Sequence, residues 1–337
     1  MIREVDKPQL TDLWCKKTAL PQSLNHIQFT GSGKGSIALV LGHLKEKGII
    51  NNKLDEVLVP DWLGYWVYNQ IQPFAFPAKA FSNRTKVIFV YHQYGFPQDM
   101  DKILEFARAK QLIVVEDCAH ALGSQYKGKP LGSFGDYTIY SFSKWFFSFA
   151  LGGVSSSQSD FKAYAETAMH HTALGLTFIK DLAKILYEYS SFRKSKLLEK
   201  FTVPFIRMSY AIYGQALKPA KLAVNLALKK TQPEIDLRQK RYQYFLEQTK
   251  NLGICDHLEP HGITPYIIPI ICPHSKNEAI LKVLASEGII SGLYNFDTNR
   301  NMLDPNFKQC IWIPCHTGVS QDKFESVTRE IIRILKK

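Results

Sequence analysis

The chain has 337 residues, of which 45% are hydrophobic and 12% aromatic, enough for one large and one small unit that each bury a core. Its formal net charge of +12 suits an anionic partner: a phosphate-bearing substrate, a membrane surface or nucleic acid. The sequence has neither zinc-finger spacing nor an RNP-like aromatic box, so we expect no nucleic acid partner. No apolar run is long enough to predict a transmembrane helix.

The six cysteines form no CxxC pair, and the opening segment MIREVDKPQLTDLW is too polar for a secretory signal. We therefore predict reduced thiols and a cytoplasmic protein. Cys255, His257 and His261 are close in sequence, but Pro260 interrupts a helical histidine pair. We predict no metal site there or elsewhere.

The first half of the chain alternates short apolar runs with helical patterns. We expect helices over 35–49 and 99–110, and strands over 56–60, 85–92, 111–117, 136–144 and 152–157. Asp99 is a candidate N-cap for the second helix. Short apolar strands alternating with helices predict a mostly parallel α/β sheet.

The second half differs in composition and pattern. Residues 159–230 are expected to be mostly helical and are basic, and a helix over 234–250 leads into a smaller α+β unit. In that unit we expect strands over 263–272 and 310–315, and helices over 277–288 and 320–337. We predict a large domain over 1–235 and a small one over 236–337.

The apolar, aromatic and basic residues of 203–230 admit two interpretations. They suit core-packing helices broken near Pro219, or a surface that contacts a membrane, with 180–230 as the candidate region for peripheral contact.

Three chemically useful side chains follow predicted strands: His92, Asp117 and Lys144. Ligands of parallel sheets bind outside the carboxyl ends of the strands, so these residues are expected at one edge. Lys144 lies in YSFSKWFFSFALGG, where apolar surroundings would disfavour the charged ammonium and make the amine a nucleophile for an aldehyde cofactor. A surface lysine at a strand end is the plain alternative.

Asp117 suits the carboxylate that pyridoxal phosphate needs beside its ring nitrogen, because the protonated ring is the electron sink. His120 is placed to bind the cofactor's phenolic oxygen or to pack on its ring. The alternatives are the N-cap of a turn for Asp117 and a core histidine for His120.

A phosphate needs donors, and TGSGKGSIALVL places glycines directly before a helix. Gly33 and Lys34 are the candidates in this turn, and Ser141, three residues before Lys144, is a third. The nucleotide P-loop is excluded, because Gln28 stands five positions before Gly33 and no Ser or Thr follows Lys34. A glycine-rich turn and an ordinary strand serine are the alternatives.

The run from VYHQYGFPQDMD through VVEDCAHALG and YKGKPLGSFGDY to SFSK resembles the DegT/DnrJ/EryC1/StrS family of pyridoxal-phosphate-dependent sugar aminotransferases. The resemblance implies fold type I of the aspartate aminotransferase superfamily, with a smaller C-terminal α+β domain. It makes Lys144 the lysine that carries the cofactor and Asp117 the carboxylate at its ring nitrogen. His120, Ser141, Gly33 and Lys34 then complete the cofactor site. The aromatic residue that covers the ring stays open among Trp62, Tyr65 and Trp66.

The resemblance further implies transfer of an amino group, with glutamate as the expected donor, to a keto sugar that is expected to be nucleotide-linked. The setting would be the biosynthesis of surface polysaccharides or secondary-metabolite sugars, and we expect a homodimer. A pyridoxal phosphate enzyme for a lipid-linked or other membrane-surface substrate is the second hypothesis. A non-catalytic family member is the third.

Overall fold

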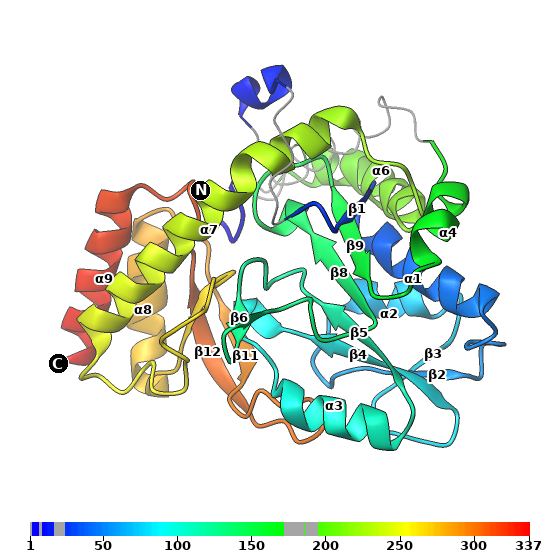
Figure 1. Ribbon diagram of the computed structural model, residues 1–337. Coiled ribbons are helices and arrows are strands. Elements are labelled where there is room, and N and C mark those ends of the chain that lie inside the picture. The colour runs from blue at the N-terminus through cyan, green and yellow to red at the C-terminus, as the bar shows by residue number, and fades with distance from the viewer. Residues whose placement is uncertain (1, 7–8, 17–23, 172–185, 187–194) are drawn as a thin grey trace.

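The computed structural model describes residues 2–6, 9–16, 24–171, 186 and 195–337, which build two larger sheets, one two-stranded hairpin and the helices around them (Figure 1). The larger sheet has seven strands in the order β1-β9-β8-β5-β4-β2-β3. Its strands are β1 (Gln28–Thr30), β2 (Glu56–Leu58), β3 (Phe76–Ala78), β4 (Thr85–Tyr91), β5 (Ile113–Asp117), β8 (Tyr137–Ser141) and β9 (Gly152–Ser156). The five strands from β3 to β8 in that order run parallel, and β9 is antiparallel to both neighbours. The predicted mostly parallel sheet is therefore confirmed.

Two sets of helices cover this sheet, because its strands are apolar on both faces. α1 (Gly33–Glu46) packs on one face with α2 (Tyr65–Ile71) and α4 (Phe161–Ala168). α3 (Met100–Ala109) covers the other face. It begins as predicted at Asp99, whose side chain accepts a hydrogen bond from the Lys102 amide.

The smaller sheet has the antiparallel order β10-β12-β11 and carries its own core. Its elements are β10 (Ile268–Ile270), α8 (His274–Ser286), β11 (Leu293–Asp297), β12 (Phe307–Ile313) and α9 (Gln321–Leu335). The N-terminal end of the chain joins this unit, because the Ile2 amide donates to Gly288 O and Ile2 O accepts from the Ile290 amide. The first residues thus pack with the small unit, although the sequence assigns them to the large one.

A single long helix, α7 (Lys221–Thr249), connects the two cores. Ala227 and Ile235 pack in the core of the large unit, and Tyr242 and Phe245 pack in that of the small unit. The predicted division at 235/236 falls inside this helix, and it stays a prediction.

Several expected elements have different bounds. The strand predicted over 136–144 ends at Ser141, and 142–144 form the 3-10 turn η4. The helix expected to begin at 234 begins at Lys221 and continues through Pro233. The strand expected over 263–272 keeps only three residues. β1, β3, β11 and α2 were not predicted, because most of them are too short for a periodic pattern.

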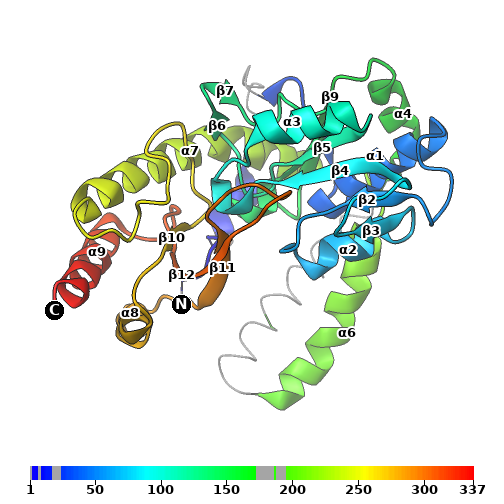
Figure 2. The same cartoon turned by 90° about the horizontal axis from the view of Figure 1, so that it is seen from below.

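Three short elements complete the description: η1 (Leu10–Trp14), η3 (Gln93–Gly95) and the hairpin β6 (Gln125–Tyr126) with β7 (Lys129–Pro130). The region between α4 and α7 contributes α6 (Lys196–Tyr213), which extends away from the body of the molecule (Figure 2). The break between α6 and α7 includes Pro219, as expected. Within the described ranges, no helix is long and apolar enough to cross a membrane. All six cysteines are free.

Candidate active site

The carboxyl ends of β4, β5 and β8 place three side chains on one face of the sheet. In the parallel register, Tyr91 of β4 lies opposite Asp117 of β5, and Asp117 lies opposite Ile139 of β8. Ser141 follows Ile139 by two residues on the same strand. Alternate residues of a strand point to the same face. By this alternation Tyr91, Asp117 and Ser141 face the α1 side, where Val115 also packs.

Asp117 combines deep burial with few partners. Among the residues that the structure describes, its carboxylate accepts one hydrogen bond, from the Ala119 amide at 3.0 Å. Burial raises the pKa of Asp117 to about 6, although that hydrogen bond and the charges of His92 and Lys144 act to lower it. A nearby positive group would stabilise the ionised form, which is what a protonated ring nitrogen offers.

The neighbouring acid, Glu116, points to the opposite face and is fully engaged. Its two oxygens accept hydrogen bonds from the amides of Gly132, Phe134 and Gly135 at 2.6–2.9 Å and lie 3.3 Å from His92 Nε2. Burial would raise the pKa of Glu116, but the hydrogen bonds and the His92 ring outweigh it and hold that pKa below its usual range. Glu116 therefore anchors the turn after β7.

His92 lies at the expected strand end, directly after β4, but its ring belongs to this anchor on the Glu116 side of the sheet. Its Nδ1 accepts from the Gln98 amide at 3.1 Å, so the ring proton lies on Nε2 and faces Glu116. In the described ranges, His92, Glu116 and Cys118 form a set whose ligand atoms lie within 4.8 Å of one another. Burial raises the pKa of the Cys118 thiol well above its usual range, and Glu116 is already saturated, so a structural role suits this cluster better than a metal.

Lys144 closes the 3-10 turn after β8. Its side chain is exposed, whereas the flanking Phe142, Trp145 and Phe146 are buried. The apolar residues around Lys144 in the sequence thus form core contacts and do not enclose the amine as expected. The ammonium still lowers the pKa values of both Asp117 and His120, which places it within electrostatic reach of both.

His120 is held by two tyrosines. Its Nδ1 lies 2.6 Å from the Tyr91 hydroxyl, and its ring stacks on Tyr266 with centroids 4.0 Å apart and an interplanar angle of 12°. Burial, then the charges of Lys144 and Arg238, hold the pKa of His120 well below its usual range. His120 is therefore a neutral, oriented ring at the edge that carries Asp117.

The glycine-rich turn lies against the end of β8. A Cβ at Gly33 would come within 2.8 Å of Ser141 Cβ and Oγ, and one at Gly152 within 2.4 Å of the Ser32 and Gly33 backbone. Only glycine permits these approaches. The Ser32 hydroxyl caps α1 by accepting from the Gly35 amide at 2.8 Å. The predicted phosphate donors Gly33 and Ser141 are thus in contact at a helix N-terminus.

Lys34 in the same turn contacts aromatic residues. Its Nζ lies 3.4 Å from the centroid of the Tyr210 ring and 4.4 Å from that of Trp66, and the two rings stack at 4.1 Å. Of the three aromatic candidates for the ring cover, Trp66 lies beside this turn and is 42% exposed, while Tyr65 is 70% exposed. Trp62 lies near Phe307 of the small unit.

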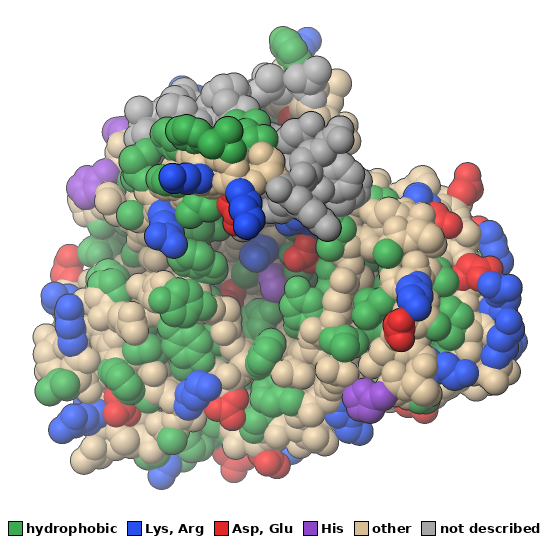
Figure 3. Space-filling model, turned by 180° about the vertical axis from the view of Figure 1, so that it is seen from behind, with side chains coloured by type: hydrophobic (Ala, Val, Ile, Leu, Met, Phe, Trp, Pro, Cys, Tyr) green, Lys and Arg blue, Asp and Glu red, His purple; other side chains and the backbone are tan. Residues whose placement is uncertain are grey.

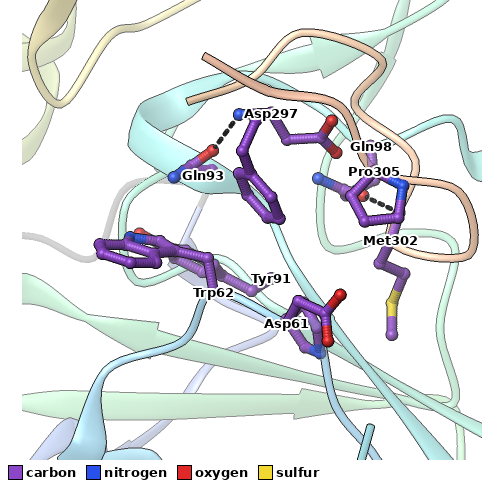
Figure 4. Close-up of a pocket in the computed structure, with 10 residues that line it drawn as sticks. Asp61, Trp62, Tyr91, Gln93, Gln98, Asp297, Met302 and Pro305 are labelled. Carbon is purple, nitrogen blue, oxygen red and sulfur yellow. Dashed lines mark hydrogen bonds between the residues drawn. The ribbon is translucent and has the colours of Figure 1, made fainter. Parts of the chain in front are cut away.

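A pocket opens between the two units beside Tyr91 (Figure 4). Gln93 Oε1 accepts from the Asp297 amide at 2.9 Å, and Gln98 Oε1 accepts from the Met302 amide at 2.8 Å. These two side chains bind the small unit to the strand-end edge. Seen from behind, a recess between the units shows His, acidic and basic side chains at its floor (Figure 3).

The site residues fit pyridoxal phosphate in three respects. Asp117 is a buried carboxylate with remaining acceptor capacity, Lys144 is an exposed residue within electrostatic reach of it, and Gly33 and Ser141 form a close-packed cradle at a helix N-terminus. Sequence reasoning missed Tyr91 and Tyr266. The position of Tyr91 at a strand end with the parity of Asp117 was a usable signal, whereas Tyr266 had none.

Residues 71–175 match the model of the DegT/DnrJ/EryC1/StrS aminotransferase family, which confirms the resemblance seen in the sequence. GDP-perosamine synthase of Escherichia coli O157:H7 is 36% identical over 137 residues, which cover 35% of this chain. The matched stretch spans only 37% of that relative's length.

Two solved structures resemble nearly the whole chain. PseC of Helicobacter pylori, described as an aminotransferase involved in pseudoaminic acid biosynthesis, has a TM-score of 0.61 at 13% identity and covers 97% of this chain and 95% of its own. Spr1654 of Streptococcus pneumoniae, in its PLP form, has a TM-score of 0.60 at 16% identity, with coverages of 95% and 92%. These likenesses show the fold and confirm the predicted fold type I.

Proposed function

We propose that this chain is a pyridoxal-phosphate-dependent aminotransferase that moves an amino group from an amino acid, expected to be glutamate, to a nucleotide-linked keto sugar. The expected setting is surface polysaccharide or secondary-metabolite sugar biosynthesis. The observation that carries the proposal is the Asp117 carboxylate, which is buried at a strand end within electrostatic reach of Lys144. The family match over 71–175 and the GDP-sugar product named for the relative support the substrate class.

Each residue would have a separate task. When bound, pyridoxal phosphate supplies an electron sink for the electrons released at the donor's Cα. Asp117 would hold the ring nitrogen protonated, and Lys144 Nζ would attach the cofactor and, once released, carry the proton to and from the donor's Cα. Gly33, Lys34 and Ser141 would bind the phosphate. His120, held by Tyr91, would orient the ring.

The absorbance spectrum of the purified protein tests this proposal. We expect a visible band from bound cofactor that disappears when glutamate is added and that is missing in Lys144→Ala. A visible band that does not change when glutamate is added would support cofactor binding and exclude glutamate as the amino donor. A protein that gives no band even after pyridoxal phosphate is added would contradict the enzyme proposal and leave only the fold.

Two finer predictions accompany the proposal. A homodimer in the cytoplasm is expected from the resemblance and the cysteine usage, and light scattering on the purified protein measures its mass.

A membrane-surface substrate is the second candidate, favoured by exposed apolar and basic side chains on α6. Loss of Lys144 with full retention of biological activity would favour the non-catalytic alternative.

A further inference from the structure

Helix α6 has one packed face and one exposed apolar face. On one side of the helix, Thr202 and Tyr213 are buried. On another side of the helix, four large apolar side chains are 48–68% exposed: Leu197, Phe201, Phe205 and Met208. Spacings of three and four residues place them in one row along the helix. We refer to these four residues as the apolar stripe.

A row of positive charge runs beside the apolar stripe. Lys196, Lys200 and Arg207 each directly precede a stripe residue, so they form a second row about 100° around the helix, and all three are exposed. They line a shallow hollow with Glu199, the one acidic residue of α6. We refer to the three as the basic edge.

The position of α6 leaves these rows accessible. The helix extends from the body of the molecule beneath α2 (Figure 2), and the upper part of the rear view shows apolar side chains next to Lys and Arg (Figure 3). A row of large apolar side chains in water is unfavourable by about 25 cal/mol per Å² of apolar surface. A surface that covers the stripe is therefore expected.

The charge on α6 indicates what covers it. A second copy related by two-fold symmetry would bring its own basic edge close to the first, and like charges repel. An anionic lipid surface is instead complementary to the basic edge and offers an acyl boundary for the stripe. The net charge of +12 acts in the same direction.

We propose that α6 docks on an anionic membrane surface, with the apolar stripe in the boundary between headgroups and acyl chains and the basic edge at the lipid phosphates. This inference does not depend on the chemistry at Lys144. It deepens the membrane-surface candidate by naming the face and the lipid charge.

The far end of α6 is attached to the candidate active site. Tyr210 stacks on Trp66, and the Ser32 hydroxyl donates to Tyr213 O at 2.5 Å. The Gly31 amide donates to Leu217 O at 2.7 Å just after the helix. Docking through α6 would thus bring the glycine-rich turn close to the lipid surface.

Co-sedimentation with vesicles tests the proposal. We expect the full chain to bind vesicles of phosphatidylcholine with about one-third phosphatidylglycerol at low salt, and to bind pure phosphatidylcholine vesicles far more weakly. Reversing the basic edge with Lys196→Glu, Lys200→Glu and Arg207→Glu should lower the partition coefficient by roughly 100-fold. Phe201→Ser with Phe205→Ser should lower it by roughly tenfold or more.

Matched controls separate α6 from the rest of the surface. The triple variant Lys53→Glu, Lys162→Glu and Lys250→Glu changes the net charge equally at exposed sites away from α6, and should keep most of the binding. Leu54→Ser with Phe76→Ser removes apolar side chains of similar exposure (64% and 58%) and should keep it as well.

Three outcomes would overturn the proposal. The first is a chain that does not bind anionic vesicles at low salt. The second is a control triple variant that loses as much binding as the α6 variant, which would assign the effect to net charge. The third is an α6 apolar variant that binds vesicles normally but changes mass by light scattering, which would make the stripe an interface between copies.

Discussion

Glu116 and Asp117 are neighbours in the chain, both buried at the end of β5, yet the two sides of the sheet that they face are built differently. On the α3 side, Glu116 meets three backbone amides and a histidine ring. On the α1 side, Asp117 accepts a hydrogen bond from one amide, and it shares its face of the sheet with Tyr91 and Ser141. The pKa of Glu116 is lowered, and that of Asp117 is raised to about 6.

This difference separates an acid that stabilises the fold from one that is available to a ligand. A buried carboxylate whose oxygens are saturated has no capacity left for chemistry. A buried carboxylate with a raised pKa carries a desolvation cost that a cationic partner would remove. Glutamate and aspartate carry the same carboxylate group, so the hydrogen-bond partners of each residue decide its role.

The largest expected effect is the loss of stability in Glu116→Gln. The NH₂ group of the new glutamine side chain would face backbone N–H groups, so donors would meet donors. Breaking such a buried network costs about 3–5 kcal/mol. Asp117→Asn, the matched substitution one residue on, should leave the free energy of unfolding unchanged or raise it. Chemical denaturation at neutral pH measures both, and equal losses would contradict the comparison.

The pH dependence of stability should be the next largest effect. Because the pKa of Asp117 rises from 3.8 to about 6 on folding, the unfolded chain loses this proton first as pH rises. The free energy of unfolding should therefore fall, by on the order of 2–3 kcal/mol, between about pH 4 and pH 6 and then level off.

Asp117→Asn should remove this downward slope. Glu116 acts in the opposite direction, since its lowered pKa gives stability that is lost as pH falls through that pKa. Denaturation of the wild type and Asp117→Asn across this pH range, without added cofactor, measures the difference. Parallel curves for the two proteins would show that Asp117 is not buried as described.

A smaller effect is expected from Gly33→Ala on the α1 side. The new methyl group would meet Ser141 at 2.8 Å, and moving either residue should weaken pyridoxal phosphate binding by about tenfold, or about 1.4 kcal/mol. Gly64→Ala is the control, because its Cβ would meet nothing within 4 Å. Titration of the cofactor measures both, and adding Ser141→Gly to Gly33→Ala should recover part of the loss. Equal affinities for the two single variants would show that the cradle is not tight.

The smallest effect concerns the orientation of His120. Tyr91→Phe removes the 2.6 Å hydrogen bond to His120 Nδ1 and should cost about 1 kcal/mol of stability. Tyr65→Phe, at a 70% exposed position, should change the free energy of unfolding very little. Denaturation measures the cost, and the imidazole nitrogen resonances of His120 should shift in the first variant alone. If the His120 resonances do not shift in Tyr91→Phe, Tyr91 does not determine the orientation of the His120 ring.

The strand-end edge could be predicted because its signals are local. Apolar runs such as 85–92 and 111–117 lead directly into polar residues, and parallel strands bring such ends together. The same signals could not distinguish Glu116 from Asp117, since the turn that saturates Glu116 comes from residues 132–135. The proposed roles of Lys144, Ser141 and the glycine-rich turn stay predictions.

The parts that could not be predicted depend on distant contacts. Tyr266 of the small unit stacks on His120, and Tyr210 of α6 contacts Lys34. Neither of these two tyrosines lies in a recognisable sequence motif. The start of α7 was misplaced because Pro233 marks a plausible helix beginning, whereas packing of Ala223 and Ala227 in the core extends the helix toward the N-terminus.

The shared helix α7 limits how evolution can recombine the two units of this protein. Its buried Arg238 donates to the carbonyl oxygens of Pro265 and Tyr266 in one unit and of Trp145 in the other. A recombination event at the 235/236 border would cut a continuous helix and separate this guanidinium from the Trp145 carbonyl and from Glu234, with which it forms an ion pair at 2.6 Å. The small unit is therefore no interchangeable module, and new specificities should arise by changes in the loops around the pocket rather than by exchange of domains.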